Sequence, residues 1–107
     1  SMNNAQNIME FPQFKNTKLN KCLDSDNVNE GQNVKINNCS MRPTQKWTYN
    51  LNTNNFTNPN KNLCLRAVST NDGSYVSLNK CNTNHINQKW IYNTMSGELK
   101  NNITNLC

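Results

Sequence analysis

Five cysteines are the residues whose chemistry this sequence indicates most directly. Cys22 and Cys39 are as far apart as Cys64 and Cys81, and the two pairs stand at matching points of a repeated sequence. In so short a chain, cysteines at regular spacing are typical of disulfides formed in an oxidising compartment. We therefore expect one bond within each pair. Zinc is the competing use of four cysteines, but the chain has no close Cys-x-x-Cys pair. Cys107 has no matching cysteine.

Catalytic chemistry has little support in the sequence. The chain has one histidine, His85, no acidic pair at a catalytic spacing and no nucleophile with a neighbouring base. Nucleophilic and acid–base mechanisms both need such sets of residues. The sequence therefore predicts a protein that is not an enzyme and that uses no metal or cofactor.

A tripeptide that occurs twice shows how the chain is organised. Gln45-Lys46-Trp47 and Gln88-Lys89-Trp90 each follow a cysteine pair in the same register, and the repeated phrase starts a third time at Asn105-Leu106-Cys107. Self-similarity at a fixed period indicates a fold built from repeated units. A unit of this size cannot cover its own apolar face, so the units must complete one core. With about two units present, the sequence also predicts open strand edges.

Apolar residues in each repeat recur at every second position, which is the period of a β-strand with one buried face. These alternating pairs are Val34/Ile36, Trp47/Tyr49, Val76/Leu78 and Trp90/Tyr92. Turn-forming residues separate them, and no helical period persists. The expected fold is all-β, with about four strands in each repeat. The tryptophans should be buried with fixed acceptors for their N–H groups, and the preceding glutamines should tie a turn or support a neighbour.

Composition restricts the partners that the chain can have. Asparagine fills 26 positions, and we interpret it as a turn former and surface filler in a loop-rich fold. The net charge is +5 at pH 7, but the lysines are spread evenly rather than clustered with aromatics, so a nucleic-acid partner is not predicted. A solvated basic surface is the simplest interpretation, and weak attraction to anionic glycans or membranes is the alternative. Apolar stretches are too short for membrane insertion.

The Cys-Leu-Asp start, the strand that ends in cysteine and the closing Gln-x-Trp resemble the ricin-type β-trefoil lectin domain. The resemblance covers about residues 14–107. It implies a barrel of three units about a pseudo-threefold axis, here an incomplete trefoil with about two of three lobes. Repeat one would span about 14–54, repeat two about 55–98 and the start of repeat three about 99–107. Residues 1–13 would be a leader, an expression remnant and a linker, in which the segment from Phe11 to Phe14 either begins the first strand or packs against the bottom of the barrel.

The resemblance also implies a shallow sugar pocket in each lobe. Such a pocket needs a carboxylate that accepts hydrogen bonds from adjacent hydroxyls, together with amides and an aromatic face. In the first lobe, Asp24 is the carboxylate and Gln45 supports it. The other candidates are Lys35, Asn37 and Thr44. They depart from the family pattern, which commonly has Gln, an aromatic residue and Asn, respectively, at these three places.

The second lobe keeps Asn87 and Gln88 as candidate sugar-binding residues. Arg66 replaces the aspartate and cannot accept a hydrogen bond, while Asn79 replaces the aromatic. His85 is a possible stacking face, although a surface histidine is the simpler interpretation, and Tyr75 has the same status.

The predicted function is non-catalytic binding of galactose- or N-acetylgalactosamine-type glycans, on glycoproteins or glycolipids, by a module of a larger secreted or cell-surface protein. The alternative is a trefoil for protein contact or assembly whose sugar pockets have degenerated. In either case, the remainder of a longer chain or a second chain is expected to complete the fold.

Overall fold

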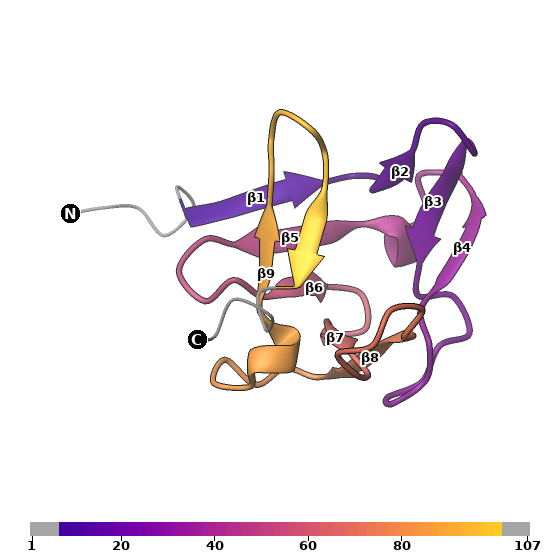
Figure 1. Cartoon of the computed structure of the whole chain (residues 1–107). Coiled ribbons are helices and arrows are strands. Elements are labelled where there is room, and N and C mark those ends of the chain that lie inside the picture. The colour runs from indigo at the N-terminus through magenta and orange to yellow at the C-terminus, as the bar shows by residue number, and fades with distance from the viewer. Residues whose placement is uncertain (1–6, 102–107) are drawn as a thin grey trace.

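A computed structural model of the protein describes residues 7–101, and they form short β-strands joined by turns (Figure 1). The strands are β1 (Ile8–Phe11), β2 (Lys15–Asn16), β3 (Lys21–Asp24), β4 (Lys35–Asn38), β5 (Trp47–Asn50), β6 (Phe56–Asn58), β7 (Leu63–Ala67), β8 (Val76–Lys80), β9 (Trp90–Tyr92) and β10 (Leu99–Asn101). Two single-turn 3-10 helices, η2 (Pro43–Gln45) and η3 (Ile86–Gln88), precede the tryptophan strands. This part of the chain has no α-helix, which confirms the all-β class.

The strands repeat in the predicted order. Hairpin β3–β4 pairs Leu23 with Ile36, and hairpin β7–β8 pairs Leu65 with Leu78. Each hairpin leads through a 3-10 turn to a tryptophan strand, β5 or β9, which pairs with the strand that follows it, β6 or β10. Strands β2–β5 and β6–β9 are therefore two copies of one unit, and β10 corresponds to the first strand of a third. This is a β-trefoil with about two of three lobes in the chain.

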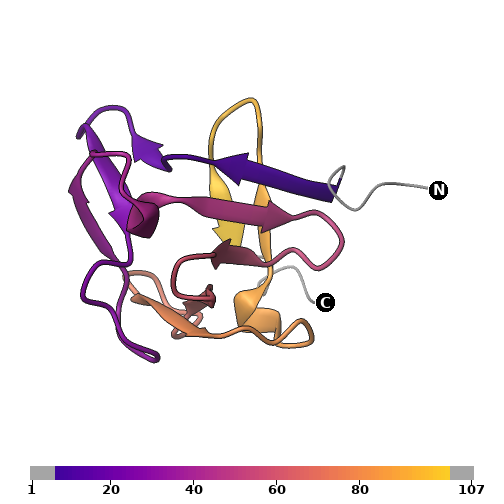
Figure 2. The ribbon, with the colours of Figure 1, turned by 180° about the vertical axis from the view of Figure 1, so that it is seen from behind.

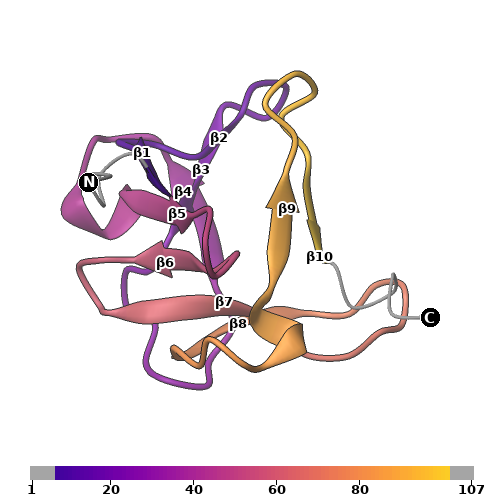
Figure 3. The ribbon, with the colours of Figure 1, turned by 90° about the vertical axis from the view of Figure 1, so that its left-hand side faces the viewer.

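The barrel strands leave two edges open. Strands β1, β5 and β6 lie side by side, and the β9–β10 hairpin stands next to them (Figures 2 and 3). The backbone N–H of Trp90 donates to the Asn54 carbonyl at 2.8 Å, and this bond joins β9 to the segment before β6. Among the described strands, β1 pairs only with β5 and β10 only with β9. The predicted open edges are thus present at β1 and β10.

The two tryptophans make equivalent contacts in the two lobes. Trp47 Nε1 donates to the Leu23 carbonyl and Trp90 Nε1 to the Leu65 carbonyl, each at 3.0 Å. Both indoles are buried, and Trp47 stacks on Phe56 with 5.5 Å between the ring centroids. The prediction that both tryptophans belong to the core, with fixed acceptors, is confirmed.

Replacement of Trp90 by phenylalanine is expected to lower the free energy of unfolding by about 1–2 kcal/mol. The buried Leu65 carbonyl would lose its donor while an aromatic ring would still fill most of the space. Urea denaturation followed by circular dichroism measures the loss. Trp47→Phe removes the matching bond to Leu23 and serves as a parallel case. A loss below about 0.5 kcal/mol in both variants would contradict a structural role for the indole N–H.

The N-terminal segment takes part in the sheet earlier than the sequence suggests. Residues 8–10, which we expected in a leader, form β1 together with Phe11 and pair with β5. Phe11 and Phe14 then pack into a cluster with Phe56 and Tyr92, with ring centroids 4.8–5.8 Å apart. The alternating pattern missed β1 because three of its four residues, Ile8, Met9 and Phe11, are apolar and partly buried, and only Glu10 is exposed.

Both disulfides form as predicted. Cys22 bonds to Cys39 across hairpin β3–β4, and Cys64 bonds to Cys81 across hairpin β7–β8. These bonds use the four cysteines for which zinc was the alternative. Cys107 and the third start of the repeated phrase lie outside the described residues.

Asparagine in this fold does more than form turns and cover the surface. Its predicted role in turns is confirmed by left-handed φ angles at four positions: Asn20, Asn27, Asn54 and Asn62. However, Asn58 is fully buried, and its amide donates to the carbonyls of Thr44 and Lys46. Asn101 makes the equivalent bonds to Asn87 and Lys89. Some asparagines are therefore internal connectors between strands, because a short amide can serve two carbonyls at once.

Candidate functional site

Asp24 is the centre of a hydrogen-bonded cluster at the end of β3. Its carboxylate is fully buried. Oδ2 accepts from Asn37 Nδ2 at 3.0 Å, from Gln45 Nε2 at 3.0 Å and from Arg42 at 2.9 Å, and Oδ1 accepts from the Asp26 N–H at 3.0 Å. Strand pairing brings Asn37 close, and turn η2 positions Arg42 and Gln45. The cluster therefore unites three elements around one negative charge.

The donors hold this carboxylate in its ionised form. Burial by itself raises the pKa of Asp24. Donors near the carboxylate, from Thr44, Gln45, Asn37 and the Asp26 backbone, lower the pKa by a larger amount, so that it falls from 3.8 to about 2. The Thr44 hydroxyl makes no hydrogen bond of good geometry to any described group. We therefore attribute the lower pKa chiefly to the two amides and the N–H, which make direct contacts. Hydrogen bonds to the charged form of a carboxylate favour that form.

Arg42 is a member of the cluster that the sequence analysis missed. Besides its bond to Asp24, its guanidinium lies 3.7 Å from Asp26 Oδ2, and its side chain is 45% exposed. Arg42 stands just before Pro43 at the start of η2, so the turn directs it back over β3. The sequence feature that could have indicated Arg42 is a basic residue three positions before Gln45, because a buried aspartate needs a nearby cation or several hydrogen-bond donors.

Gln45 and Gln88 have the same structural role in the two lobes. Gln45 Nε2 donates to the Asn38 carbonyl, and its Oε1 accepts from the Ser40 N–H. Gln88 Nε2 donates to the Lys80 carbonyl, and its Oε1 accepts from the Asn82 N–H. Each glutamine therefore ties the end of a hairpin to the loop that follows. Within residues 7–101, only the Gln45 side chain has an additional partner, Asp24.

The remaining first-lobe candidates lie at the margin of the cluster. Thr44 contributes mainly its carbonyl, which accepts from Ser25 and Asn58. Lys35 pairs with Asp24 in the strand register, but its side chain is exposed. It lines a separate hollow of about 500 Å³ beside Gln32. The structure thus joins Asp24, Asn37 and Gln45 closely and leaves Lys35 outside.

The second lobe has a different set of contacts. Arg66 lies where the first lobe has Asp24, and its buried Nε has no hydrogen-bond partner among the described residues. Asn87 Nδ2 donates to the Ala67 carbonyl, and Asn79 accepts from Ser77. His85 Nδ1 accepts from the Asn87 N–H, so the ring closes turn η3.

No carboxylate cluster is therefore present at this position of the second lobe, where Arg66 stands. Tyr75, the other residue that could stack on a sugar, is 68% exposed at its edge. Within residues 7–101, no group of histidine, cysteine and acidic side chains is arranged to hold a metal ion. The same residues include no helix that is long and apolar enough to cross a membrane.

Comparison with known proteins gives one clear match. The model of the ricin-type β-trefoil lectin domain matches residues 10–107, almost the whole chain. A comparison with curated proteins found no significant match. The match agrees with the repeated hairpins, the two equivalent tryptophans and the paired disulfides described above. The chain belongs to the ricin-type β-trefoil lectin family.

Proposed function

We propose that this chain is a carbohydrate-binding module that directs a larger secreted protein to galactose- or N-acetylgalactosamine-type glycans. Domains of this family are carbohydrate-binding modules and are generally non-catalytic. The observation that carries the proposal is the first-lobe cluster, in which Asp24, Asn37 and Gln45 converge at the place where the family's pocket has its carboxylate. The two disulfides support an extracellular location.

Arg42 controls access to this pocket in our proposal. Its guanidinium takes the position on Asp24 Oδ2 that a pair of sugar hydroxyls would need. Because the side chain is about half exposed, it can move into solvent at the cost of an ion pair worth about 1 kcal/mol. Adjacent hydroxyls of the sugar then replace it on Asp24, and the Asn37 amide and the Thr44 edge orient the ring. Lys35 contacts an outer substituent.

The second lobe is a weaker candidate for the same function. Asn87 and Gln88 already use their amides on backbone carbonyls, and Arg66 offers donors instead of acceptors. Sugar binding there would rely on the outer surface of Asn87.

A trefoil for protein contact is the second candidate function. It is favoured by one observation, that three side-chain donors of the chain itself already occupy Oδ2 of Asp24. Among the described strands, β1 and β10 each have one unpaired edge, which also supports a further part of the fold, supplied by a longer chain or by a second chain.

The Arg42→Ala variant separates the two functions. If Arg42 competes with the sugar, its removal should tighten binding of galactose or N-acetylgalactosamine by about fivefold to tenfold, because no ion pair must be broken. Titration calorimetry with millimolar sugar measures the change. Lys80→Ala removes a distant exposed charge and should leave the affinity unchanged. Absence of sugar binding by both the wild type and Arg42→Ala would reject the lectin pocket and favour protein contact.

A further inference from the structure

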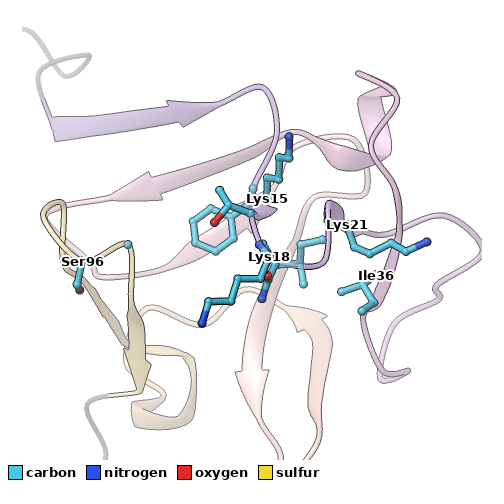
Figure 4. Close-up of a pocket in the computed structure, with 10 residues that line it drawn as sticks. Lys15, Lys18, Lys21, Ile36 and Ser96 are labelled. Carbon is cyan, nitrogen blue, oxygen red and sulfur yellow. Dashed lines mark hydrogen bonds between the residues drawn. The ribbon is translucent and has the colours of Figure 1, made fainter.

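One apolar strand pair is uncovered in the first lobe although its equivalent in the second lobe is buried. Leu65 and Leu78 are 2% and 0% exposed. At the matching positions, Leu23 is only partly buried and Ile36 is 56% exposed. Leu23 and Ile36 line a hollow of about 530 Å³ between the β2–β3 turn and the β9–β10 turn, with Ile36 and Ser96 on opposite sides (Figure 4). The first lobe therefore lacks a contact that the second lobe has.

A segment of the first lobe makes that contact in the second lobe. The Gly31 N–H donates to the Leu78 carbonyl at 2.7 Å, and the Val34 N–H donates to the Val76 carbonyl at 3.0 Å. We call residues 31–34 the covering segment. It lies along the outer edge of β8 as an added strand, and its contact with Leu78 links the two lobes.

The same edge of the first-lobe hairpin is free. The repeat makes Ile36 the equivalent of Leu78. Among the described residues, the backbone of Ile36 has no hydrogen-bond partner outside hairpin β3–β4. Unpaired N–H and C=O groups on a strand edge can pair with a further strand. The edge of β4 at Ile36 can therefore accept a covering segment from elsewhere.

The second lobe has a covering segment of its own, residues 73–76, and this one is unused. Gly73 corresponds to Gly31, and both have left-handed φ angles, 80° and 85°. Tyr75 stands at the position of Asn33. Asn33 forms a β-bridge with the second lobe, whereas Tyr75 is 68% exposed. One half of the contact between lobes is thus free at each end of the described chain.

Asn16, which lines the same hollow, lacks partners that its two equivalents have. The side-chain amides of Asn58 and Asn101 each donate to two backbone carbonyls beside a tryptophan turn. Asn16 Oδ1 accepts from the N–H groups of Lys18 and Leu19, but within residues 7–101 no group accepts from Asn16 Nδ2. This donor is therefore available to a further tryptophan turn.

The hollow suits apolar contact better than it suits an anion. Lys15, Lys18 and Lys21 at its rim point in different directions (Figure 4). The Lys21 ammonium donates to Asn38 Oδ1 at 2.6 Å. The lysines therefore do not converge on one point, and the exposed Ile36 side chain remains the feature to be covered.

We propose that this face binds one further unit of the same repeat. We call it the docking face; it consists of Asn16, Leu23, Ile36 and residues 73–76. The covering segment of the incoming unit pairs with β4 at Ile36, its tryptophan turn offers carbonyls to Asn16, and its hairpin receives residues 73–76. Repeated units complete one another's core in this way. The proposal does not depend on Asp24 or on sugar binding.

The occupant is a single unit and not a second intact copy of the chain. In a threefold arrangement, two lobes leave one vacant place, and that place touches both ends of the docking face. A rigid second copy would bring two lobes to it, and one of them would overlap the first copy.

A synthetic peptide of residues 63–98, with the Cys64–Cys81 disulfide formed, is the probe for this face. It contains a hairpin, a covering segment and a tryptophan turn. Calorimetry and two-dimensional NMR should show that it binds the whole 107-residue chain. On saturation, the Ile36 amide should become protected from hydrogen exchange, because it gains the kind of strand partner that Leu78 already has.

Two variants of the chain test the contacts. Ile36→Asp is expected to bind the peptide at least about tenfold more weakly, because it places a charge in the apolar contact. Met41→Asp is the matched control, since it makes the same charge change at a residue that is 57% exposed, and it should bind within about twofold of the wild type. Asn16→Asp keeps the turn acceptor and removes the amide donor, so it should weaken binding about fivefold. Asn62→Asp, in the β6–β7 turn, is its control.

The proposal is overturned if the peptide does not bind the wild type, if Ile36→Asp binds like the wild type, or if either control loses as much affinity as its test variant. It is also overturned if sedimentation shows that the wild type alone forms a dimer that Ile36→Asp dissociates, because a second copy would then be the occupant. Sugar titrations of Ile36→Asp should match the wild type, which keeps this test separate from that of the first-lobe pocket.

Discussion

Removal of the Cys64–Cys81 disulfide, in the variant Cys64→Ala/Cys81→Ala, is expected to lower the free energy of unfolding by about 3 kcal/mol. The bond closes a loop with a sequence separation of 17, and a loop near this length contributes about 3 kcal/mol in the chain-entropy model. For a domain of this size, such a loss lowers the melting temperature by about 10–20 °C. Urea denaturation and thermal melting measure both quantities.

The second disulfide provides a matched comparison. Cys22–Cys39 has the same sequence separation, so Cys22→Ala/Cys39→Ala should lose a similar amount. Removal of both bonds should leave the chain largely unfolded, because about 6 kcal/mol exceeds the low end of the stability of small domains. A loss below about 1 kcal/mol for each bond would mean that the hairpins are held mainly by packing and strand pairing.

Asp24→Asn is expected to destabilise the fold by about 3 kcal/mol at neutral pH. The amide offers one oxygen where the carboxylate offers two, so its NH2 group must face either the Asp26 N–H, which bonds Oδ1, or the three donors Asn37, Gln45 and Arg42, which share Oδ2. Arg42 also loses its buried counter-charge. Loss of one partner of a buried charged group costs several kcal/mol, reduced here because Arg42 is half exposed.

The same interaction predicts a dependence on pH. Because folding lowers the pKa of Asp24 from 3.8 to about 2, its contribution is complete above about pH 4 and is lost as the pH falls toward about 2. That contribution is about 2 kcal/mol. The stability gap between the wild type and Asp24→Asn should therefore narrow in acid. Asp72→Asn, in an exposed loop, should change little at either pH, and a constant gap for Asp24→Asn would contradict this account.

The contribution of Asp24 to stability affects how sugar binding must be tested. Loss of binding in an Asp24 variant could come from a weakened fold, because the carboxylate organises Asn37, Gln45 and Arg42. Arg42→Ala is the sharper test, since it changes access to Asp24 and leaves the two amide contacts in place.

Much of the fold could be predicted from residue periodicity. Alternating apolar residues indicated the strands at Trp47 and Trp90, and equal spacing indicated both disulfides. These features could be predicted because each depends on side chains that are close in sequence or that repeat at a fixed spacing. Strand β1 was missed, since partly buried residues on an open edge carry no clear alternation.

The site was harder to predict from the sequence than the fold. Asp24 and Gln45 were identified, but their interaction with Arg42 was not, because it depends on how turn η2 folds back over β3.

The sequence alone determined the repeat, the all-β class, the disulfide pairing and the burial of the tryptophans, because these follow from local pattern and spacing. Tertiary structure decided which polar groups meet. It makes Asp24, the expected sugar ligand, a buried acceptor shared by three side chains, Asn37, Gln45 and Arg42. The physical reason is that hydrogen bonds and electrostatic fields depend on distances in space, which packing sets and spacing in the chain does not.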